Sequence, residues 1–445
     1  MKKKGAPMDG NQYAVHFIRD LKLERVPEAV VHQAKRCLLD LVGAGLAGAH
    51  VRGAGILLDF SSDQMKGRRE ATVIRGGQKR SSIAAALVNG FIVNALDIDD
   101  GYRKVKGHPG AAVFPAVLAL SEKVSATGKA FLEALIVGYE IGIRAGEILH
   151  SHYGYYHGSG SWGAIASAAA GGKLLGLSED EMKHALGIAE AFAPLVPEMR
   201  AVEYPSMAPK DGIPWGAMVG TSAALLARRG FTGIPSLLGD QNRNRDVFTL
   251  GKDFRILGIY FKPYPCCRWA HPALDGLLSI RKKAGLNHRE IESIIVRTFS
   301  EAASLFSGPP TTLENAEYSL SYPLAVAAVF GEFSPNYLAE PYFRNRDVLR
   351  MMRKIAIKID RRFQGQFPER CLSEVEVRTK QGKVYRSQVL TVRGDVDSPL
   401  TDEELEEKFR NVTEGILKED QKRRFIRLVW HFEKHSVRDL IRFLR

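Results

Sequence analysis

The residue types best suited to proton-transfer chemistry are concentrated in one short segment, residues 97–110. It contains three carboxylates, one imidazole and three cations, at Asp97, Asp99, Asp100, His108, Arg103, Lys104 and Lys106. Carboxylate and imidazole groups close together can serve as general acid and base. Glycine and proline interrupt the helical pattern between the apolar runs 84–96 and 111–120, so we expect a loop between two buried helices. Catalytic side chains concentrate in such loops, although the composition alone also fits a solvated surface turn.

A second candidate is the segment 150–163, which contains three histidines and three tyrosines. Imidazoles can ligate zinc, but Glu147 is the only nearby carboxylate and the H-E-x-x-H pattern is absent. His157 precedes a Gly/Ser run that opens an expected helix, where exposed backbone N–H groups favour a substrate carboxylate. We therefore favour a catalytic or substrate-contacting histidine over a metal site.

Two further segments place cations beside rigid proline or aromatic residues. Lys210 and Asp211 lie just ahead of an Ala/Gly-rich helix, and Lys262 and Arg268 belong to the run Lys-Pro-Tyr-Pro-Cys-Cys-Arg-Trp-Ala-His. Cations in such settings can bind carboxylates through charge-assisted hydrogen bonds. Taken singly, each segment also fits a solvated lysine near a turn.

The elements that must position these residues change in character along the chain. Residues 12–260 are expected to be mainly helical, with helix starts marked by Pro27 and by a capping box at Ser178. Beyond residue 262, runs rich in β-branched residues predict strands at 291–298, 354–360, 373–379 and 383–390. The last two strands flank residues 380–382, which predict the turn of a hairpin. A capping box at Thr401 then opens a helical tail that we expect to pack back on the first domain.

The predicted fold is mainly α, with a large all-helical domain (1–261 and 396–445) and a smaller α+β domain (262–395). Small residues in the expected helices at 164–172 and 216–226 imply helices that pack closely. The run Gly43–Gly48 matches G-x-G-x-x-G, but it follows a helical pattern instead of a strand, so dinucleotide binding is not expected.

The composition fits a globular enzyme, with 45% hydrophobic and 25% charged residues. Four scattered cysteines, two of them adjacent, argue against a disulfide framework and for a reducing compartment. The N-terminus lacks the pattern of a signal peptide and no apolar run reaches the length of a membrane helix, so we expect a cytoplasmic protein without a membrane partner. The net charge of +13 favours polyanions, whether small polycarboxylates, an anionic membrane surface or nucleic acid, but no nucleic-acid-binding motif supports the last class.

Taken together, four motifs in this order resemble the MmgE/PrpD family. They are Asp-x-Asp-Asp with a later His-Pro-Gly, a His-x5-Gly loop before an Ala-rich helix, Lys-Asp-Gly, and Lys-Pro-Tyr-Pro-Cys-Cys-x3-His. The resemblance extends over most of the chain and implies a helical domain with an α+β lid, a homodimer, and catalysis without metal or organic cofactor. The activities that it implies are 2-methylcitrate dehydratase, cis-aconitate decarboxylase and iminodisuccinate epimerase, all of which move a proton next to a carboxylate.

Motif by motif, the resemblance implies catalytic roles for four residues, Asp97, His108, His157 and Lys210. It implies substrate binding by Lys262, Arg268, His271 and Tyr322. In the resulting hypothesis one histidine is the base, the other is the acid, and Asp97 orients His108. Gly101 stands where the dehydratase and decarboxylase branches commonly have a hydroxyl residue, and Cys267 stands where the decarboxylase branch has a histidine. Both departures argue against cis-aconitate decarboxylation. The predicted reaction is elimination of water from a 2-methylcitrate-like hydroxy di- or tricarboxylate, with epimerisation of a substituted succinate as the alternative.

Overall fold

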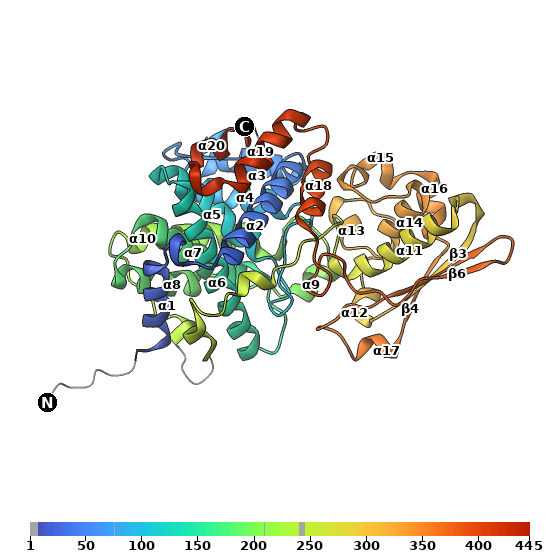
Figure 1. The fold of residues 1–445 in the computed structure, drawn as a ribbon, viewed down its shortest axis with the longest axis horizontal. Helices are drawn as coiled ribbons and strands as arrows, with labels where there is room; N and C mark the ends of the chain where they lie inside the picture. The colour runs from blue at the N-terminus through green and yellow to red at the C-terminus, as the bar shows by residue number, and fades with distance from the viewer. Residues whose placement is uncertain (1–7, 75, 209, 240–244) are drawn as a thin grey trace.

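The computed structural model describes residues 8–74, 76–208, 210–239 and 245–445, and these are mainly helical, as predicted. Figure 1 shows the helices of the first half of the chain on one side and a small sheet with its covering helices on the other. The helix α18 (Asp402–Val412) lies at the junction of the two parts. The cavity described below lies between these two parts.

The larger part consists of helices that the sequence begins with recognisable signals. The helix α2 follows Pro27, and in α8 the Ser178 hydroxyl accepts from the N–H of Glu181 while the Glu181 carboxylate accepts from the N–H of Ser178, so both predicted starts are confirmed. The helices in this part are α1 (Gly10–Asp20), α2 (Glu28–Gly48), α3 (Arg52–Gln64), α4 (Ser82–Asn94), α5 (Pro109–Val124), α6 (Gly128–His152), α7 (Gly160–Leu175), α8 (Glu179–Phe192), α9 (Glu198–Glu203) and α10 (Ile213–Ala227). A short antiparallel pair, β1 (Ala71–Thr72) and β2 (Lys79–Arg80), interrupts the helical pattern that we expected throughout this part.

Small residues allow α7 and α10 to pack with their backbones in close contact. A Cβ atom at Gly220 would lie 2.3 Å from the carbonyl oxygen of Ala164, and one at Gly216 would lie 2.5 Å from that of Gly160. Real Cβ atoms do not approach a carbonyl oxygen so closely, so only glycine fits at these positions. The close packing that the Ala/Gly-rich runs predicted is therefore confirmed.

The smaller part contains a four-stranded mixed sheet in the order β4-β3-β5-β6. Its strands are β3 (Ile291–Thr298), β4 (Ile355–Ile359), β5 (Glu374–Thr379) and β6 (Val384–Arg386). β3 pairs with β4 in parallel and with β5 in antiparallel orientation, and β5 and β6 form the predicted hairpin. The helices of this part are α11 (His271–Ala284), α12 (Ser300–Ala303), α13 (Leu313–Glu317), α14 (Ser321–Phe330), α15 (Glu340–Phe343), α16 (Arg346–Met352) and α17 (Arg361–Gln364).

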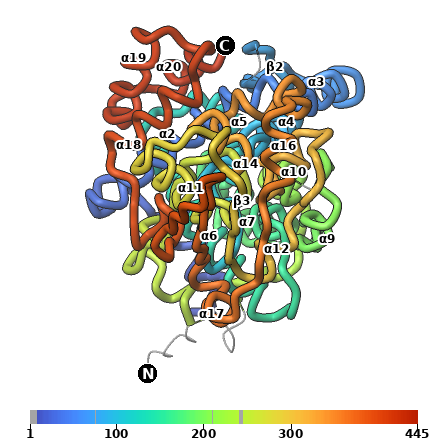
Figure 2. Tube along the Cα trace, turned by 90° about the vertical axis from the view of Figure 1, so that its right-hand side faces the viewer, coloured from blue at the N-terminus to red at the C-terminus, as the bar shows by residue number. Residues whose placement is uncertain are grey.

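The C-terminal helices α18, α19 (Glu419–Trp430) and α20 (Val437–Ile441) return to the helical part, where α18 and α19 pack against α2. Figure 2 shows these C-terminal helices grouped on one side of the molecule, next to α2. On α18 the buried Lys408 ammonium lies 2.5 Å from Oδ1 of Asp40 in α2 and 2.7 Å from the carbonyl oxygen of Ile98. The tail therefore also supports the loop that follows α4.

The run Gly43–Gly48 forms the end of α2, so the strand that a dinucleotide site requires does not precede it. Across the described residues, no single helix is long and apolar enough to cross a membrane. The consecutive helices α2 and α3 reach that length and composition only as a pair, and they are bent by 87°.

Candidate active site

The loop between α4 and α5 is fixed to its surroundings by backbone hydrogen bonds. The N–H of Gly101 donates to the carbonyl of Tyr260 at 3.0 Å, and the N–H of Tyr260 donates back at 2.9 Å. Within the loop, the N–H of Tyr102 donates to the carbonyl of Gly107 at 2.9 Å. His108 ends the loop immediately before Pro109, the first residue of α5. The imidazole is therefore attached to a rigid helix end, as a precise catalytic position requires.

The structure gives a steric reason for glycine at position 101. A Cβ atom there would lie 2.3 Å from the ring and from the hydroxyl of Tyr260, which lines the cavity. The Tyr260 side chain thus takes the space that a side chain at position 101 would need. Glycine at position 101, where other branches of the family that the sequence resembles have a hydroxyl residue, therefore goes together with a tyrosine at position 260 in this chain.

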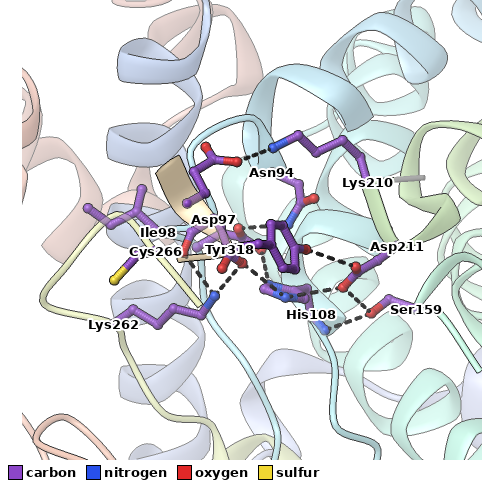
Figure 3. Close-up of polar contacts among 12 residues, drawn as sticks. Asn94, Asp97, Ile98, His108, Ser159, Lys210, Asp211, Lys262, Cys266 and Tyr318 are labelled. Carbon is purple, nitrogen blue, oxygen red and sulfur yellow. Dashed lines mark hydrogen bonds and ion pairs between the residues drawn. The ribbon is translucent and has the colours of Figure 1, made fainter. Parts of the chain in front are cut away.

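The His108 ring lies among three carboxylates, as Figure 3 shows in part. Its Nδ1 lies 2.9 Å from Oδ2 of Asp99, and its Nε2 lies 3.2 Å from Oδ2 of Asp211 and 3.4 Å from Oδ1 of Asp97. The sequence hypothesis assigned the orienting role to Asp97, but the shortest contact with the ring belongs to Asp99. Asp99 is itself held by Asn94, whose side-chain amide donates to it at 3.1 Å.

These contacts determine the charge of the imidazole. Burial opposes a charged ring, but Asp99 first and Asp211 next outweigh burial and raise the pKa of His108 to about 9. Burial likewise works against the Asp99 carboxylate, yet the neighbouring His108 cation lowers its pKa below the usual value. At neutral pH the ring is therefore an imidazolium that can donate a proton from Nε2.

A cavity adjoins His108 at the junction of the two parts. Its lining residues are Asp97, Arg103, Lys106, His108, Tyr156, Glu198, Val202, Asp211, Tyr260, Lys262, Cys267, Arg268, Trp269, Tyr318, Phe367 and Pro368. Cations are prominent in this lining, and the half-buried Lys106 forms no ion pair with a carboxylate among the described residues. Aromatic rings form much of the remaining wall, so the cavity suits a small anion that also presents apolar surface.

Lys262 reaches the loop from the other side of the cavity. Its ammonium lies 2.5 Å from Oδ1 of Asp97 and 2.8 Å from the Asp97 carbonyl oxygen. Burial disfavours this cation, but Asp97 first and Asp99 next more than compensate, so the pKa of Lys262 is raised. Lys262 thus remains charged inside the cavity wall.

Asp211 lies in a strained turn that precedes α10. Three consecutive residues have positive φ, with 29° at Lys210, 51° at Asp211 and 68° at Gly212. Asp97 and Lys106 also have positive φ, at 47° and 51°. Non-glycine residues rarely adopt this conformation unless the surrounding structure enforces it, and such strain is typical of functional sites.

Glu198 and Asp211 form a buried carboxylate pair in the cavity wall. Burial and then the adjacent Asp211 charge raise the pKa of Glu198 well above its usual range. The hydroxyl groups of Ser159 and Tyr318 each lie 3.5 Å from an oxygen of Asp211.

The structure brings four of the eight predicted site residues to the cavity, namely Asp97, His108, Lys262 and Arg268. Lys210 lies behind the wall, where its ammonium donates to Oε2 of Glu317 at 2.6 Å and to the Ala95 carbonyl at 2.8 Å. Figure 3 shows the Lys210 ammonium paired with a carboxylate. Because Glu317 belongs to α13, this ion pair joins the two parts of the molecule. The catalytic role that the resemblance implied for Lys210 stays a prediction.

The other three predicted residues, His157, His271 and Tyr322, are completely buried outside the cavity lining. His157 packs against the ring of Tyr155, and burial lowers its pKa. The Nε2 atom of His271 lies 3.1 Å from the carbonyl oxygen of Cys266, and the Tyr322 hydroxyl donates to the Tyr337 carbonyl at 2.6 Å. In this conformation their contacts are with protein groups.

Sequence reasoning missed several cavity residues or gave them minor roles. Asp99 was given no catalytic role, although it belongs to the same Asp-x-Asp-Asp motif as Asp97. Asp211 was noted only as the neighbour of Lys210, and Tyr156 only as one of the tyrosines in the segment 150–163, while Glu198 lies in a segment with no recognisable signal. Tyr260 could have been found only through its pairing with Gly101.

Three side-chain atoms of Asp97, Asp99 and His108 lie within 4.8 Å of one another, a spacing that could accommodate a metal ion. The charges at this position do not fit that use. The Lys262 ammonium already occupies Oδ1 of Asp97, and the pKa of about 9 keeps His108 protonated, whereas a metal ligand must be a neutral imidazole. The cluster is therefore better suited to proton transfer than to metal binding.

With this geometry established, comparison with known proteins assigns the chain to a family. The chain belongs to the MmgE/PrpD family, because the MmgE/PrpD N-terminal domain matches residues 13–257 and the MmgE/PrpD C-terminal domain matches residues 264–434.

Curated relatives match most of the chain at low identity. A cis-aconitate decarboxylase-like protein, oryM, of Aspergillus oryzae is 26% identical, with 92% of this chain and 91% of the relative covered. The human cis-aconitate decarboxylase is 25% identical, with 94% and 90% covered. The 2-methylcitrate dehydratase of Salmonella typhimurium is 24% identical, with 75% and 74% covered. The relatives are thus lyases of two kinds, and this supports a lyase activity here.

Proposed function

We propose that this protein is a lyase that acts on a small polycarboxylate and requires no cofactor. The single observation that supports this best is the His108 imidazolium, which Asp99 holds at Nδ1 and which presents Nε2 to Asp211. A proton donor and a carboxylate base thus lie side by side in a cavity lined with cations. That is the arrangement needed to move a proton next to a substrate carboxylate.

Elimination of water is our first candidate reaction. The Asp211 carboxylate takes the proton from the carbon next to a substrate carboxylate, and the electrons of that C–H bond form the new double bond. The C–O bond breaks as His108 donates its Nε2 proton to the departing hydroxyl, which leaves as water. The 3.2 Å separation of Asp211 and His108 then lets the abstracted proton return to the imidazole. Lys262 offsets negative charge that develops on the substrate carboxylate.

Decarboxylation is the second candidate, and it is supported by how much of the chain each kind of relative covers. The cis-aconitate decarboxylases match over 90% of this chain, whereas the dehydratase from Salmonella typhimurium matches 75%. In this reaction the bond to one carboxylate breaks, CO₂ leaves, and the electron pair on carbon takes the proton from His108. Only the acid is then required, and the neutral imidazole takes its next proton from solvent.

Proton NMR in deuterium oxide separates these reactions when purified protein is supplied with citrate, 2-methylcitrate, cis-aconitate and iminodisuccinate. A hydro-lyase produces new alkene signals from a hydroxy acid. A decarboxylase releases CO₂ from the unsaturated acid, and the proton signals of that acid are replaced by those of a product with one carboxylate fewer. An epimerase introduces deuterium next to the carboxylate without forming an alkene. Conversion of none of these compounds at substrate-saturating concentration would contradict the proposed function.

A further inference from the structure

Two arginines of the cavity lining come from different parts of the chain and share one buried counter-ion. Arg103 belongs to the loop between α4 and α5, and Arg268 lies just before α11. The Nε atom of Arg103 lies 2.7 Å from Oδ1 of Asp395, while Nη2 of Arg268 donates to Oδ2 of the same carboxylate. Asp395 is 1% exposed and does not itself line the cavity.

The backbone around Asp395 is fixed in position. The N–H of Phe261 donates to the carbonyl of Gly394 at 3.1 Å, and the N–H of Gly394 donates to the Ser398 carbonyl at 2.8 Å. Gly394 has a φ of 88°, and a Cβ atom there would lie 2.0 Å from the Phe261 carbonyl oxygen, so this contact requires glycine. The segment that holds Asp395 is thus attached to the chain immediately before Lys262.

Asp395 occupies only part of the hydrogen-bonding capacity of the two guanidinium groups. Each guanidinium carries five N–H donors in a planar fork that matches a carboxylate. Arg268 also lies over the Tyr260 ring, with its Cζ 4.8 Å from the ring centroid, which fixes the plane of the fork. Two such cations repel each other, so their shared position depends on the negative charge between them.

We propose that Asp395 is a positioning residue that holds Arg103 and Arg268 as a clamp for one carboxylate of the substrate, and so sets a preference for tricarboxylates over acids with fewer carboxylates. This inference rests on the proposed function, because it names the groups that select the polycarboxylate. Asp395 does not contact the substrate. It acts through the two arginines.

The test uses two probes that differ by one carboxylate, tricarballylate and glutarate, with binding measured by calorimetry. The wild-type protein binds tricarballylate more tightly than glutarate. In Asp395→Asn the dissociation constant of tricarballylate rises about tenfold or more, the usual scale for loss of a charge-assisted contact. The dissociation constant of glutarate changes much less, so the selectivity between the two acids falls. With a turned-over substrate, KM rises more than kcat falls.

Asp397→Asn is the matched control, because this carboxylate also binds Arg103, at 2.6 Å, but is 56% exposed on its side chain. A single exposed ion pair contributes little, so binding by this variant should remain close to wild type. Arg103→Gln provides a second route if Asp395→Asn folds poorly, as judged by circular dichroism. It should weaken tricarballylate binding, and the double variant with Asp395→Asn should lose less than the sum of the two single effects.

The outcomes separate this inference from the proposed function. If Asp395→Asn and Arg103→Gln both keep the wild-type selectivity, the proposal that Asp395 positions a carboxylate clamp is wrong, while the proposed lyase function is unaffected. If the wild-type protein neither binds tricarballylate nor converts any polycarboxylate, the proposed function itself is contradicted.

Discussion

Nδ1 of His108 lies 2.9 Å from Oδ2 of Asp99, and this contact leaves Nε2 directed to the carboxylates of the cavity wall. Both residues are buried, so their opposite charges interact in a medium that screens them weakly. The contact fixes the orientation of the ring and keeps it protonated at neutral pH. An acid in this state can donate a proton without first taking one from solvent.

Asp99→Asn should lower the rate and shift its pH dependence. Without the Asp99 charge, the pKa of His108 falls from about 9 towards its ordinary value of 6.5 or below, because burial then dominates. If the imidazolium is the acid, wild-type kcat/KM declines as the pH rises through about 9, and the decline moves to lower pH in the variant. Rates measured from pH 6 to 10 test this, and an unshifted profile would remove Asp99 from the role of holding the proton.

The same contact predicts a pH dependence of stability. The folded protein holds the His108 proton more tightly than the unfolded chain does, because the pKa is raised from 6.5 to about 9. The stabilisation is fully present below pH 6.5 and is lost as the pH rises through 9. Urea denaturation should show a fall of roughly 1–3 kcal/mol in the free energy of unfolding over this range. The fall should be much smaller in Asp99→Asn, and equal slopes in the two proteins would contradict the assignment.

His108→Asn should reduce kcat by at least about a hundredfold, the usual scale for a positioned acid or base. His157→Asn is the comparison, because this second histidine is buried outside the cavity lining. We expect its loss of kcat to be smaller than tenfold. Steady-state rates on one identified substrate measure both variants. A comparable loss in the two variants would return His157 to the catalytic set and imply a conformation in which it reaches the cavity.

Lys210→Met should destabilise the protein through its partner in α13. Burial raises the pKa of Glu317 to about 8 even though Lys210 lowers it, so loss of the ammonium leaves a buried carboxyl group without its cation. The free energy of unfolding should fall by roughly 2–4 kcal/mol. Adding Glu317→Gln should recover part of that loss, as measured by urea denaturation. Additive effects of the two substitutions would show that the ion pair contributes nothing beyond the separate residues.

The excess of positive charge should accelerate substrate capture. The chain has a formal net charge of +13, and cations are prominent in the lining of the cavity. Attraction over long distances is screened by salt, so kcat/KM for a polycarboxylate should fall as ionic strength rises while kcat changes little. Steady-state kinetics between about 20 and 500 mM NaCl measure this, since the Debye length shortens across that range. A kcat/KM that does not respond to salt would show that the charge does not steer the substrate.

Local patterns predicted much of the architecture. The capping boxes at Ser178 and Thr401 predicted where α8 and α18 begin, because their hydrogen bonds join groups within one helical turn. The glycines that allow α7 and α10 to approach were visible as Ala/Gly-rich runs. The run of β-branched residues at 291–298 also predicted β3 with its observed bounds.

For the candidate site, the sequence by itself determined which segments supply the chemistry, since the motifs at 97–110, 210–212 and 262–271 all contribute side chains to the cavity wall or to the ion pairs behind it. Only the tertiary structure decided how those side chains pair. Asp99 instead of Asp97 makes the shortest contact with His108, and Lys210 turns to Glu317 instead of to the cavity. The physical reason is that helix signals act between residues three or four positions apart, whereas the charge of a buried group depends on partners that distant segments bring against it.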